Sequence, residues 1–396
     1  MDPLTAPPGS PRPTDPSPPP AEPLSFQVLG GTEAARCGLL RVRGQEVLTP
    51  AFMPVGTRAA VKGVEPDALL ELGYRLILAN TYHLLVRPGP ERIARLGGVH
   101  RFMSWPGALL TDSGGFQAFS LTGLSRLSEE GVTFRSHLDG SAHALTPERA
   151  VQIQEQYGSD ILMPLDVCLG LPAGRQELAE ALERTTRWLV RSRQAWQDPT
   201  HHALFGIVQG GTELDLRARH AAELAELDLP GYAIGGLSVG EKNEEMYFVT
   251  AHTTRHLPVT KPRYLMGVGT PEDLVACSLA GVDLFDCVLP TRTARTGRLA
   301  TRYGDLIIKN ARYAEDPAPL DPTCRCPTCR SFSRAYLRHL FVNQDPLAVR
   351  LHTLHNLHYY ATLMAELREA IAGGTIKQFL VSFHGDRAQL GVRKKP

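Results

Sequence analysis

Short runs of apolar residues alternate with amphipathic stretches from about residue 50 onward. Each run ends in polar or glycine-rich residues, and a stretch with helical spacing follows. Because parallel strands covered on both faces read as continuous apolar runs, this pattern predicts a set of parallel strands. The predicted strands are Ala51–Val55, Arg75–Ala79, Ala108–Thr111, Ile161–Leu165, Leu204–Val208, Tyr232–Ile234, Tyr264–Met266 and Val282–Phe285.

Two of the intervening helices have clear signals. The stretch Glu177–Trp196 is predicted to be helical because Leu178, Leu182, Thr185 and Leu189 recur on one face. Thr146 followed by Pro147 marks another helix start, with threonine as the N-cap and proline in the first turn. Strands that alternate with helices in this way predict an α/β fold.

Eight such strands are typical of a closed (β/α)8 TIM barrel. An open, doubly wound sheet is the alternative. That fold typically carries a glycine fingerprint after its first strand, and Pro54-Val55-Gly56-Thr57 does not have one. We therefore expect the barrel.

Polar or glycine-rich residues follow most of the predicted strands. In a barrel the carboxyl ends of all strands converge on one face, where active sites of this fold lie. Three carboxylates, from Asp112, Asp166 and Asp286, are therefore expected at one mouth, and a purely structural role is the less favoured explanation for such a set. The strand ends are Asn80–His83, Asp112–Gln117, Asp166–Cys168, Gln209–Gly211, Gly235–Leu237, Gly267–Gly269 and Asp286.

Asp286 ends the last predicted strand, and three arginines follow Pro290 in an expected exit loop: Arg292, Arg295 and Arg298. Guanidinium groups suit phosphates, so this stretch indicates chemistry on a nucleic acid. The alternative is a partly buried aspartate paired with a neighbouring arginine. Taken alone, the stretch favours that salt bridge, and the other strand ends shift the balance toward chemistry.

The carboxylates suit the cleavage of a glycosidic bond. One acid can attack the anomeric carbon while a second transfers protons, and the configuration is retained. A third can accept hydrogen bonds from adjacent N–H groups, as on the edge of guanine. A base removed from its stack is held between apolar or aromatic faces. Phe116 and Met266 are candidates for that sandwich, with core packing as the alternative for each.

Composition adds three limits. The chain has 396 residues, 43% of them hydrophobic, which is ample for a large core, and its net charge of +1 confines any RNA surface to a local patch. No apolar run approaches the roughly 20 residues of a membrane span. Residues 1–23 are rich in proline, serine and alanine, so we expect a disordered tail that is not a signal peptide.

Seven cysteines in uneven positions indicate a reducing, cytoplasmic location and metal or thiol use. Cys324, Cys326 and Cys329 lie within six residues, and a closed tetrahedral zinc site needs a fourth ligand. The spacing alone leaves that ligand open among His352, His355 and His358. A site of three thiolates and one imidazole is closed, so the zinc is expected to be structural.

The segment Arg302–Asn343 around these cysteines is expected to form a small insertion before the last helix. It carries basic residues suited to an RNA backbone, although a solvated face is the alternative. These residues are Lys309, Arg312, Arg325, Arg330, Arg334 and Arg338.

Several specific motifs together identify a known family. They are Leu78–Leu84, Thr111–Gln117, Gly206–Gly211, Phe285–Arg292 and the three cysteines with His355–Leu357. With them the chain resembles the bacterial tRNA-guanine transglycosylases from about Phe26 to the C-terminus. The division that we expect is a tail over 1–23, a barrel over 24–301, a zinc insertion over 302–350, and the last barrel helix with a C-terminal tail over 351–396.

The resemblance implies an enzyme of queuosine biosynthesis, a pentosyltransferase that acts as a homodimer. It would exchange guanine at the anticodon wobble position of tRNAs for Asp, Asn, His and Tyr. The incoming base would be 7-aminomethyl-7-deazaguanine, and no cofactor besides one structural Zn²⁺ per subunit is expected.

The resemblance also implies roles for individual residues. Asp286 matches the nucleophile that attacks ribose C1′, and Asp112 matches the general acid/base. The residues that match the base site are Asp112, Ser113, Gly114, Gly115, Phe116, Asp166, Gln209, Gly236, Leu237 and Met266, with Phe116 and Met266 as the stacking pair. The residues that match the tRNA-binding elements are Gly267, Val268, Gly269, Thr270, Pro271, Glu272 and Asp273, and Thr291, Arg292, Thr293, Ala294 and Arg295. Cys324, Cys326, Cys329 and His355 match the zinc ligands.

The chain departs from the family pattern at two positions. Val167 replaces an acidic residue that many bacterial members carry, although its partner acid is kept as Glu241. Phe116 stands where some members have tyrosine. Cys168 is typical of the bacterial, smaller-base pocket. A queuine-inserting enzyme, a non-catalytic RNA-binding paralogue and a plain glycoside hydrolase are the alternatives.

Overall fold

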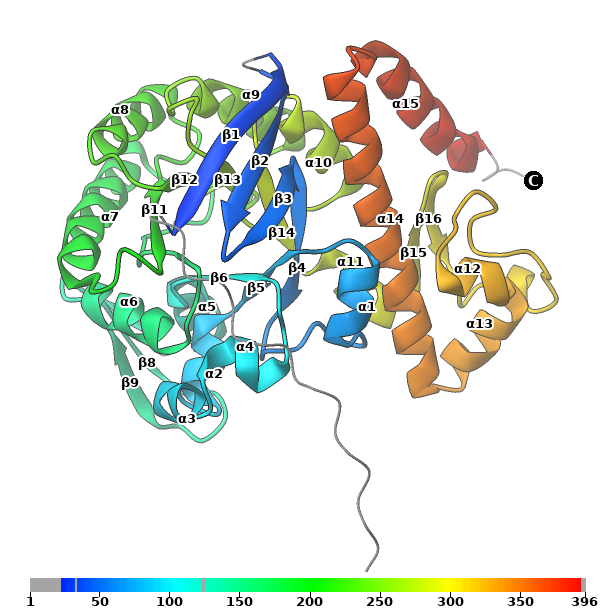
Figure 1. Ribbon diagram of the computed structural model, residues 1–396, viewed down its shortest axis with the longest axis horizontal. Helices are drawn as coiled ribbons and strands as arrows, with labels where there is room; N and C mark the ends of the chain where they lie inside the picture. The colour runs from blue at the N-terminus through cyan, green and yellow to red at the C-terminus, as the bar shows by residue number, and fades with distance from the viewer. Residues whose placement is uncertain (1–22, 33, 123–124, 393–396) are drawn as a thin grey trace, which may run out of the picture.

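A closed barrel of eight parallel strands forms the centre of the molecule, as predicted (Figure 1). The computed structural model describes residues 23–32, 34–122 and 125–392. The predicted tail therefore lies outside the described residues, apart from Pro23. Around the barrel the strands follow chain order: β4 (Ala51–Gly56), β5 (Leu76–Ala79), β6 (Ala108–Thr111), β10 (Ile161–Leu162), β11 (Ala203–Val208), β12 (Gly231–Ile234), β13 (Arg263–Leu265) and β14 (Leu284–Cys287). β10 is shorter than predicted because Pro164 has no N–H to continue the ladder.

Alternate residues of each strand serve two different cores. In β11, Phe205 and Ile207 point into the barrel, whereas Leu204 and Val208 pack against the surrounding helices. Both sets are fully buried, which explains why the strands read as continuous apolar runs.

Helices cover the outside of the barrel. Predicted features are confirmed in two of them: the long helix α7 covers the predicted Glu177–Trp196 to within a residue or two, and Thr146 Oγ1 caps α6 by accepting from the Arg149 N–H at 3.2 Å. The helices between the barrel strands are α1 (Pro66–Glu71), α2 (Thr81–Val86), α3 (Pro90–Arg95), α4 (Gly98–Met103), α5 (Gly115–Thr122), α6 (Pro147–Gln156), α7 (Arg175–Ala195), α8 (Leu214–Ala225), α9 (Asn243–Thr254) and α10 (Pro271–Ser278).

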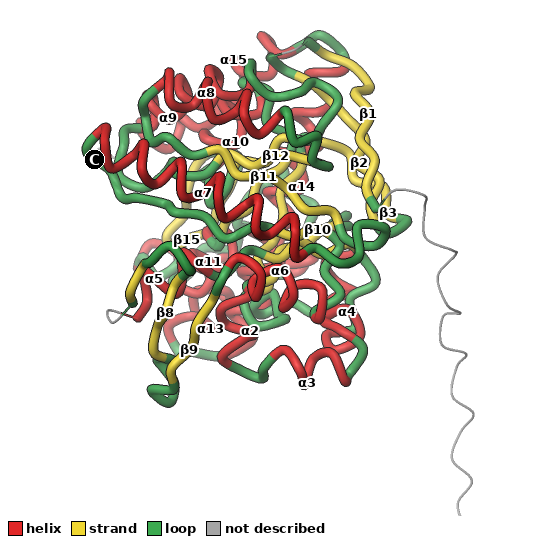
Figure 2. The backbone as a smooth tube through the Cα atoms, turned by 90° about the vertical axis from the view of Figure 1, so that its left-hand side faces the viewer, coloured by secondary structure: helices red, strands yellow, loops and turns green. Residues whose placement is uncertain are grey.

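Two antiparallel sheets were not predicted. One joins β1 (Leu24–Gly31), β2 (Arg36–Val42) and β3 (Gln45–Thr49), and its apolar side chains close the amino-terminal end of the barrel. The other joins β7 (Arg126–Leu127), β8 (Val132–Arg135) and β9 (Ala142–Leu145) within the connection from β6 to α6. In Figure 2, β8 lies beside α5 at the lower end of the molecule.

A small unit follows the barrel and packs on the far side of α14 (Pro346–Ala372) (Figure 1). It has its own apolar core, to which Leu306, Leu337 and Leu351 belong. Its elements, with the helices that flank it, are α11 (Leu289–Arg295), β15 (Arg298–Thr301), β16 (Gly304–Ile307), the 3₁₀ helix η1 (Ala311–Tyr313), α12 (Pro327–Ser331), α13 (Arg334–Val342) and α15 (Ile376–Val392). The expected boundary between residues 350 and 351 falls within α14.

Candidate active site

A cavity of about 310 Å³ lies at the carboxyl ends of the barrel strands. Side chains or backbone from the ends of β5, β6, β12, β13 and β14 line it, together with the segment after β10. The predicted site residues that the structure brings together here are Asp112, Ser113, Phe116, Asp166, Gly236, Leu237, Met266, Gly267 and Asp286.

Asp112, just beyond β6, is held by the neighbouring strand end. Its Oδ1 accepts from the Thr81 N–H at 2.8 Å, and its Oδ2 accepts from Asn80 Nδ2 at 2.5 Å. Burial raises the pKa of Asp112 to about 7; the Thr81 hydrogen bond opposes this rise and the charge of Asp286 adds to it. Near neutral pH the carboxyl is therefore divided between its acid and base forms, as proton transfer in both directions requires.

Asp286, on β14, is fixed through a single oxygen. Its Oδ1 accepts from the Tyr264 hydroxyl at 2.6 Å and from the Gly267 N–H at 2.7 Å. Burial raises the pKa of Asp286, and these two hydrogen bonds oppose the rise by stabilising the carboxylate. Across the described residues both hydrogen bonds go to Oδ1, and none goes to Oδ2.

The salt-bridge alternative for Asp286 is wrong. No ion pair involves Asp286 in the described part of the chain. Asp283, which directly precedes β14, is the aspartate that pairs with an arginine, Arg36, at 2.5 Å and at the opposite end of the barrel. Arg298 pairs with Asp305 at 2.5 Å instead of standing free for phosphates.

Asp166 is the polar floor of the cavity, and Gln209 supports it. Gln209 Nε2 donates to Asp166 Oδ2 at 2.7 Å, and burial raises the pKa of Asp166 to about 6. The Gln209 side chain lies over Gly235 and Gly236, where an added Cβ would come within 2.7 Å of Nε2 and 2.3 Å of Oε1 respectively. Glycine is therefore required at both positions for the amide to reach Asp166.

Three of the predicted base-binding residues do not line the cavity: Gly114, Gly115 and Gln209. Gly114 has a φ of +78°, and a Cβ there would meet the Tyr82 nitrogen at 2.7 Å. A Cβ on Gly115 would meet Leu165 Cδ1 at 2.5 Å. These glycines allow close packing beneath the turn that carries Ser113 and Phe116.

The predicted tRNA segment 267–273 is only partly accessible. Gly267 and Glu272 are exposed, and Thr270 caps α10 by accepting from the Asp273 N–H at 3.2 Å. Asp273 is buried and accepts from Tyr247 and Asn243, whereas Val268, Gly269 and Pro271 are also buried. Gly267 and Glu272 are thus the exposed members of the segment predicted to bind tRNA.

The segment Thr291–Arg295 is not the exit loop that we expected but the helix α11. Pro290 sits in its first turn, where a proline starts a helix instead of breaking it. Arg292 is exposed and Arg295 half-buried, while Thr291 and Ala294 are buried and Thr293 Oγ1 donates to the Leu289 carbonyl at 2.7 Å. The two arginines, three residues apart, share one side of the helix.

Several lining residues were missed, including Leu78, Ser238, Val239 and Val288. Tyr264 is the most consequential of those missed, because it donates to Asp286. The signal was present: in a strand, Tyr264 and Met266 point to the same face, and Met266 was already a candidate.

Val167, where many bacterial members carry an acid, and its partner acid Glu241 have different surroundings. Val167 is buried, and its N–H donates to Thr185 Oγ1 at 3.0 Å. Glu241 accepts from the N–H groups of Ser238 and of Val239, the latter at 3.1 Å, just after the Gly236-Leu237 pair. Glu241 therefore fixes the backbone at the edge of the cavity, and Val167 contributes no charge to it.

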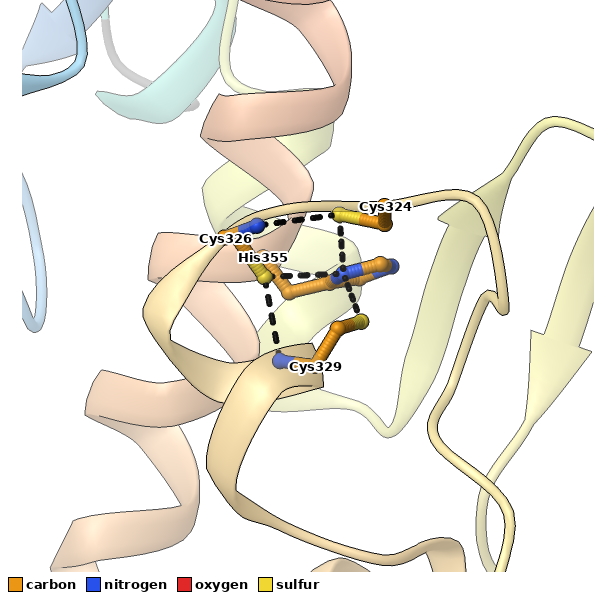
Figure 3. A group of neighbouring side chains, drawn as sticks. All are labelled: Cys324, Cys326, Cys329 and His355. Carbon is orange, nitrogen blue, oxygen red and sulfur yellow. Dashed lines mark hydrogen bonds between the residues drawn. The ribbon is translucent and has the colours of Figure 1, made fainter.

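A second candidate site lies between the small unit and α14. Cys324, Cys326, Cys329 and His355 place their ligand atoms within 4.8 Å of one another (Figure 3). His355 Nδ1 lies 3.7, 3.5 and 3.3 Å from the three sulfurs in chain order. Around a tetrahedral zinc ion, ordinary bond lengths set that nitrogen–sulfur separation at about 3.6 Å.

The hydrogen bonds around His355 select the tautomer that a metal needs. Its Nε2–H donates to the Ala300 carbonyl at 2.8 Å, so Nδ1 carries the free lone pair toward the sulfurs. His352 Nδ1 instead lies 3.3 Å from the Ala294 carbonyl. Of the three sulfurs, His358 Nδ1 lies close only to that of Cys324, at 3.5 Å. The group could therefore hold one metal ion.

The basic residues of the small unit do not all face solvent freely. Arg334 pairs with Asp316 at 3.0 Å, Arg312 stacks on the Tyr313 ring at 4.7 Å, and Arg338 donates to the Asn310 carbonyl. Lys309, Arg325 and Arg330 are exposed.

Among the helices in the described residues, none has the length and the apolar composition of a membrane span.

Comparison with known proteins agrees with this geometry. Residues 32–389 match the family described as queuine tRNA-ribosyltransferase. A queuine tRNA-ribosyltransferase from Dinoroseobacter shibae is 53% identical over 92% of this chain and 97% of its own. Those from Caldanaerobacter subterraneus subsp. tengcongensis and Syntrophobacter fumaroxidans are 52% and 54% identical over 92% of this chain, covering 99% and 98% of their own.

Proposed function

The chain belongs to the queuine tRNA-ribosyltransferase family, and on that basis we propose that it exchanges guanine at the tRNA wobble position for a 7-deazaguanine. It is a tRNA-guanine transglycosylase, a pentosyltransferase. The pairing of Asp112 and Asp286 across one cavity carries this proposal, because the two carboxyls have the different environments that acid/base and nucleophilic roles require.

Asp286 begins the reaction. Its free Oδ2 attacks ribose C1′, a C1′–O bond forms, and the C1′–N bond breaks with its electron pair leaving on guanine. Asp112, in its acid form, gives the departing base a proton. In the second half Asp112 takes a proton from the incoming base, whose nitrogen attacks C1′ and restores the Asp286 carboxylate. Two displacements retain the configuration.

The polar floor reads the base. The carboxylate of Asp166, fixed by Gln209, accepts from adjacent N–H groups such as those on the edge of guanine. The Gly236-Leu237 backbone offers hydrogen bonds at the opposite edge, and Phe116 and Met266 stack on the two faces. Phe116 is 49% exposed without a ligand, which fits a ring that a base covers on binding.

The incoming base is 7-aminomethyl-7-deazaguanine, with queuine as the second candidate. Glu241 and Cys168 support the smaller base, since both remain at the cavity edge. Val167 supports a wider tolerance, because the charge that many bacterial members carry there is missing. Competition between the two bases in one exchange assay decides between them.

A cluster of cations supports RNA binding at the mouth. Burial and the charges of Arg295 and Arg58 lower the pKa of Lys62, and burial and Arg292 lower the pKa of Arg295. Within the described ranges none of these four groups has an ion-pair partner. The negative charges of a phosphate backbone relieve this repulsion between the four cations. On this proposal, α11 and the segment after β4 hold the anticodon loop of tRNAs for Asp, Asn, His and Tyr.

Zinc is the metal that best fits three thiolates and one imidazole, and it fastens the small unit to α14. The next residue, Asn356, donates to the Pro290 carbonyl at 2.9 Å and accepts from the Ala300 N–H at 2.9 Å. The metal-bearing turn of α14 thus also fixes the start of α11, which carries the arginines.

The enzyme acts as a homodimer. Apolar side chains stay exposed on α13 and at the start of α14: Tyr336, Val342 and Leu347 are between 37% and 46% exposed, and Tyr336 stacks on Phe332. A second copy covering them would remove this apolar surface from water. Light scattering across a dilution series gives the subunit number.

Exchange of labelled guanine into tRNA tests the function. The proposal requires incorporation that depends on Asp286 and leaves an intact chain. An abasic product identifies a hydrolase, whereas tRNA binding without incorporation identifies an RNA-binding paralogue.

A further inference from the structure

A buried arginine lies directly beneath the base-reading backbone. Arg217, on α8, is 0% exposed, and its guanidinium donates to three main-chain carbonyls. These are Gly211 at 2.8 Å, Val208 at 3.1 Å and Gly236 at 3.2 Å. The carbonyls come from the ends of β11 and β12, so one side chain ties together two adjacent strand ends at the mouth.

The charge of Arg217 is unusual for such a position. It forms no ion pair with a carboxylate anywhere in residues 23–32, 34–122 and 125–392. Burial lowers its pKa to about 10, so the group stays charged at neutral pH; main-chain oxygens are its hydrogen-bond partners, and the more distant charge of Glu241 also favours the cation. Burying a cation in this way costs free energy, which a hydrophobic residue of similar size would not.

A histidine on the same helix completes the support. His220, three residues along α8, is also 0% exposed, and its Nδ1 accepts from the Gln209 N–H at 2.9 Å. Burial lowers its pKa to about 3, so it is neutral, and its Nε2–H donates to Thr186 Oγ1 at 3.1 Å. Arg217 and His220 therefore hold the chain on both sides of the Gln209 side chain.

Both contacts bear on groups that face the base. The Gln209 amide sets the orientation of Asp166, and its Oε1 packs against Gly236, where a Cβ would come within 2.3 Å. The Gly236 carbonyl shares its peptide group with the Leu237 N–H. A guanidinium that donates to this carbonyl fixes the plane of that peptide and strengthens its N–H as a donor.

We infer that Arg217, with His220, is a positioning residue for base recognition: it sets the Gly236-Leu237 peptide and the Gln209 turn that read the incoming base. This inference rests on the proposed function and adds a determinant of base affinity that touches no substrate atom. Arg217 should therefore affect the affinity for the base and not the affinity for tRNA, because the arginines of α11 lie elsewhere on the mouth.

The test compares Arg217→Met with Arg263→Met. Arg263 is a matched control: it is 2% exposed and donates to the carbonyls of Leu257 and Gly281, but it begins β13 at the opposite end of the barrel. KM for guanine and KM for tRNA are measured for each protein, alongside thermal unfolding. We expect Arg217→Met to raise KM for guanine by about tenfold to a hundredfold, the effect of one misplaced charge-strengthened hydrogen bond. KM for tRNA should change less than about twofold.

Arg263→Met should lower the unfolding temperature and leave both KM values near those of the wild type. The inference is overturned if Arg217→Met keeps the wild-type KM for guanine, or if both KM values rise together as in a general loss of structure. Absence of exchange in the wild-type protein would instead reject the proposed function itself.

Two further variants keep the test decisive if Arg217→Met does not fold. Arg217→Lys keeps the charge but cannot reach three carbonyls, so it should show an intermediate KM for guanine. Arg217→Ala leaves a guanidinium-sized space, and millimolar guanidinium chloride should lower its KM for guanine toward the wild-type value. A wild-type KM for guanine in Arg217→Lys, or no guanidinium response in a folded Arg217→Ala, contradicts the positioning role.

Discussion

Asp112 and Asp286 face the same cavity, and the negative charge of Asp286 helps to raise the pKa of Asp112 to about 7. Burial makes the larger contribution. The proposed nucleophile Asp286 thus helps to keep Asp112 protonated, because two carboxylates that share a site do not both ionise freely. Each role depends on the charge state of the other residue, and the following predictions use that dependence.

Tyr264→Phe should weaken catalysis while leaving the fold intact. The Tyr264 hydroxyl lowers the pKa of Asp286 through a 2.6 Å hydrogen bond, so its loss raises that pKa and reduces the ionised fraction. We expect kcat to fall by about tenfold and the acidic limb of the pH–rate profile to move to higher pH. Tyr74→Phe is the control, because it removes another buried hydroxyl, one that donates to the Leu357 carbonyl. Equal profiles for the two variants would exclude this role for Tyr264.

Asp112→Asn should abolish base exchange. Its free energy of unfolding should also increase relative to that of the wild type as the pH rises. Folding raises the pKa of Asp112 from 3.8 to about 7, so between those values the folded protein binds the extra proton. Stability therefore falls as pH rises through this window and is flat above it, and asparagine avoids the loss. Urea unfolding between pH 5 and pH 8 should show Asp112→Asn gaining about 1 to 3 kcal/mol on the wild type. A difference that stays constant across the series would contradict the raised pKa of Asp112.

Arg292→Ala and Arg295→Ala should weaken tRNA binding through lost phosphate contacts. Each should reduce the slope of log affinity against log salt concentration by about one, measured by fluorescence anisotropy at several salt concentrations. Arg298→Ala removes an arginine that is already paired with Asp305 and should leave the slope unchanged. The RNA role of α11 fails if all three variants behave alike.

Loss of the metal should loosen the small unit and, through Asn356, the start of α11. We expect Cys326→Ser to lose bound zinc, lower the unfolding temperature and raise KM for tRNA more than KM for guanine. The buried Cys277 lies outside the cluster, so Cys277→Ala should keep its zinc. Full zinc content in Cys326→Ser, measured by atomic absorption, would show that the cluster is not the metal site.

The barrel could be predicted because its strands are buried on both faces, so each appears as an unbroken apolar run. The β1–β3 sheet could not, since β1 is largely exposed and Leu24 is its one buried residue, so it does not appear as an apolar run. The exit loop expected at Thr291–Arg295 is a helix because Pro290 occupies a first turn, a position that the sequence does not distinguish from a break.

The carboxylates of the site were predictable because they end strands that converge. The groups around them were harder to predict. Arg217 and His220 lie on a helix whose polar residues read as surface, and Tyr264 was missed although it shares a strand face with Met266. Gly114 and Gly115, predicted at the base, pack closely against Tyr82 and Leu165. Strand ends thus indicate where chemistry takes place, whereas the groups that tune it become visible only after folding.

Trapping of the covalent intermediate tests the central claim most directly. Wild-type protein mixed with tRNA in the absence of free base should give a denaturation-resistant protein–RNA adduct, and peptide mass spectrometry should place the ribose on Asp286. Asp286→Asn should bind tRNA with near wild-type affinity and form no adduct. An adduct of undiminished yield in Asp286→Asn, or one that maps to Asp112, would contradict the account.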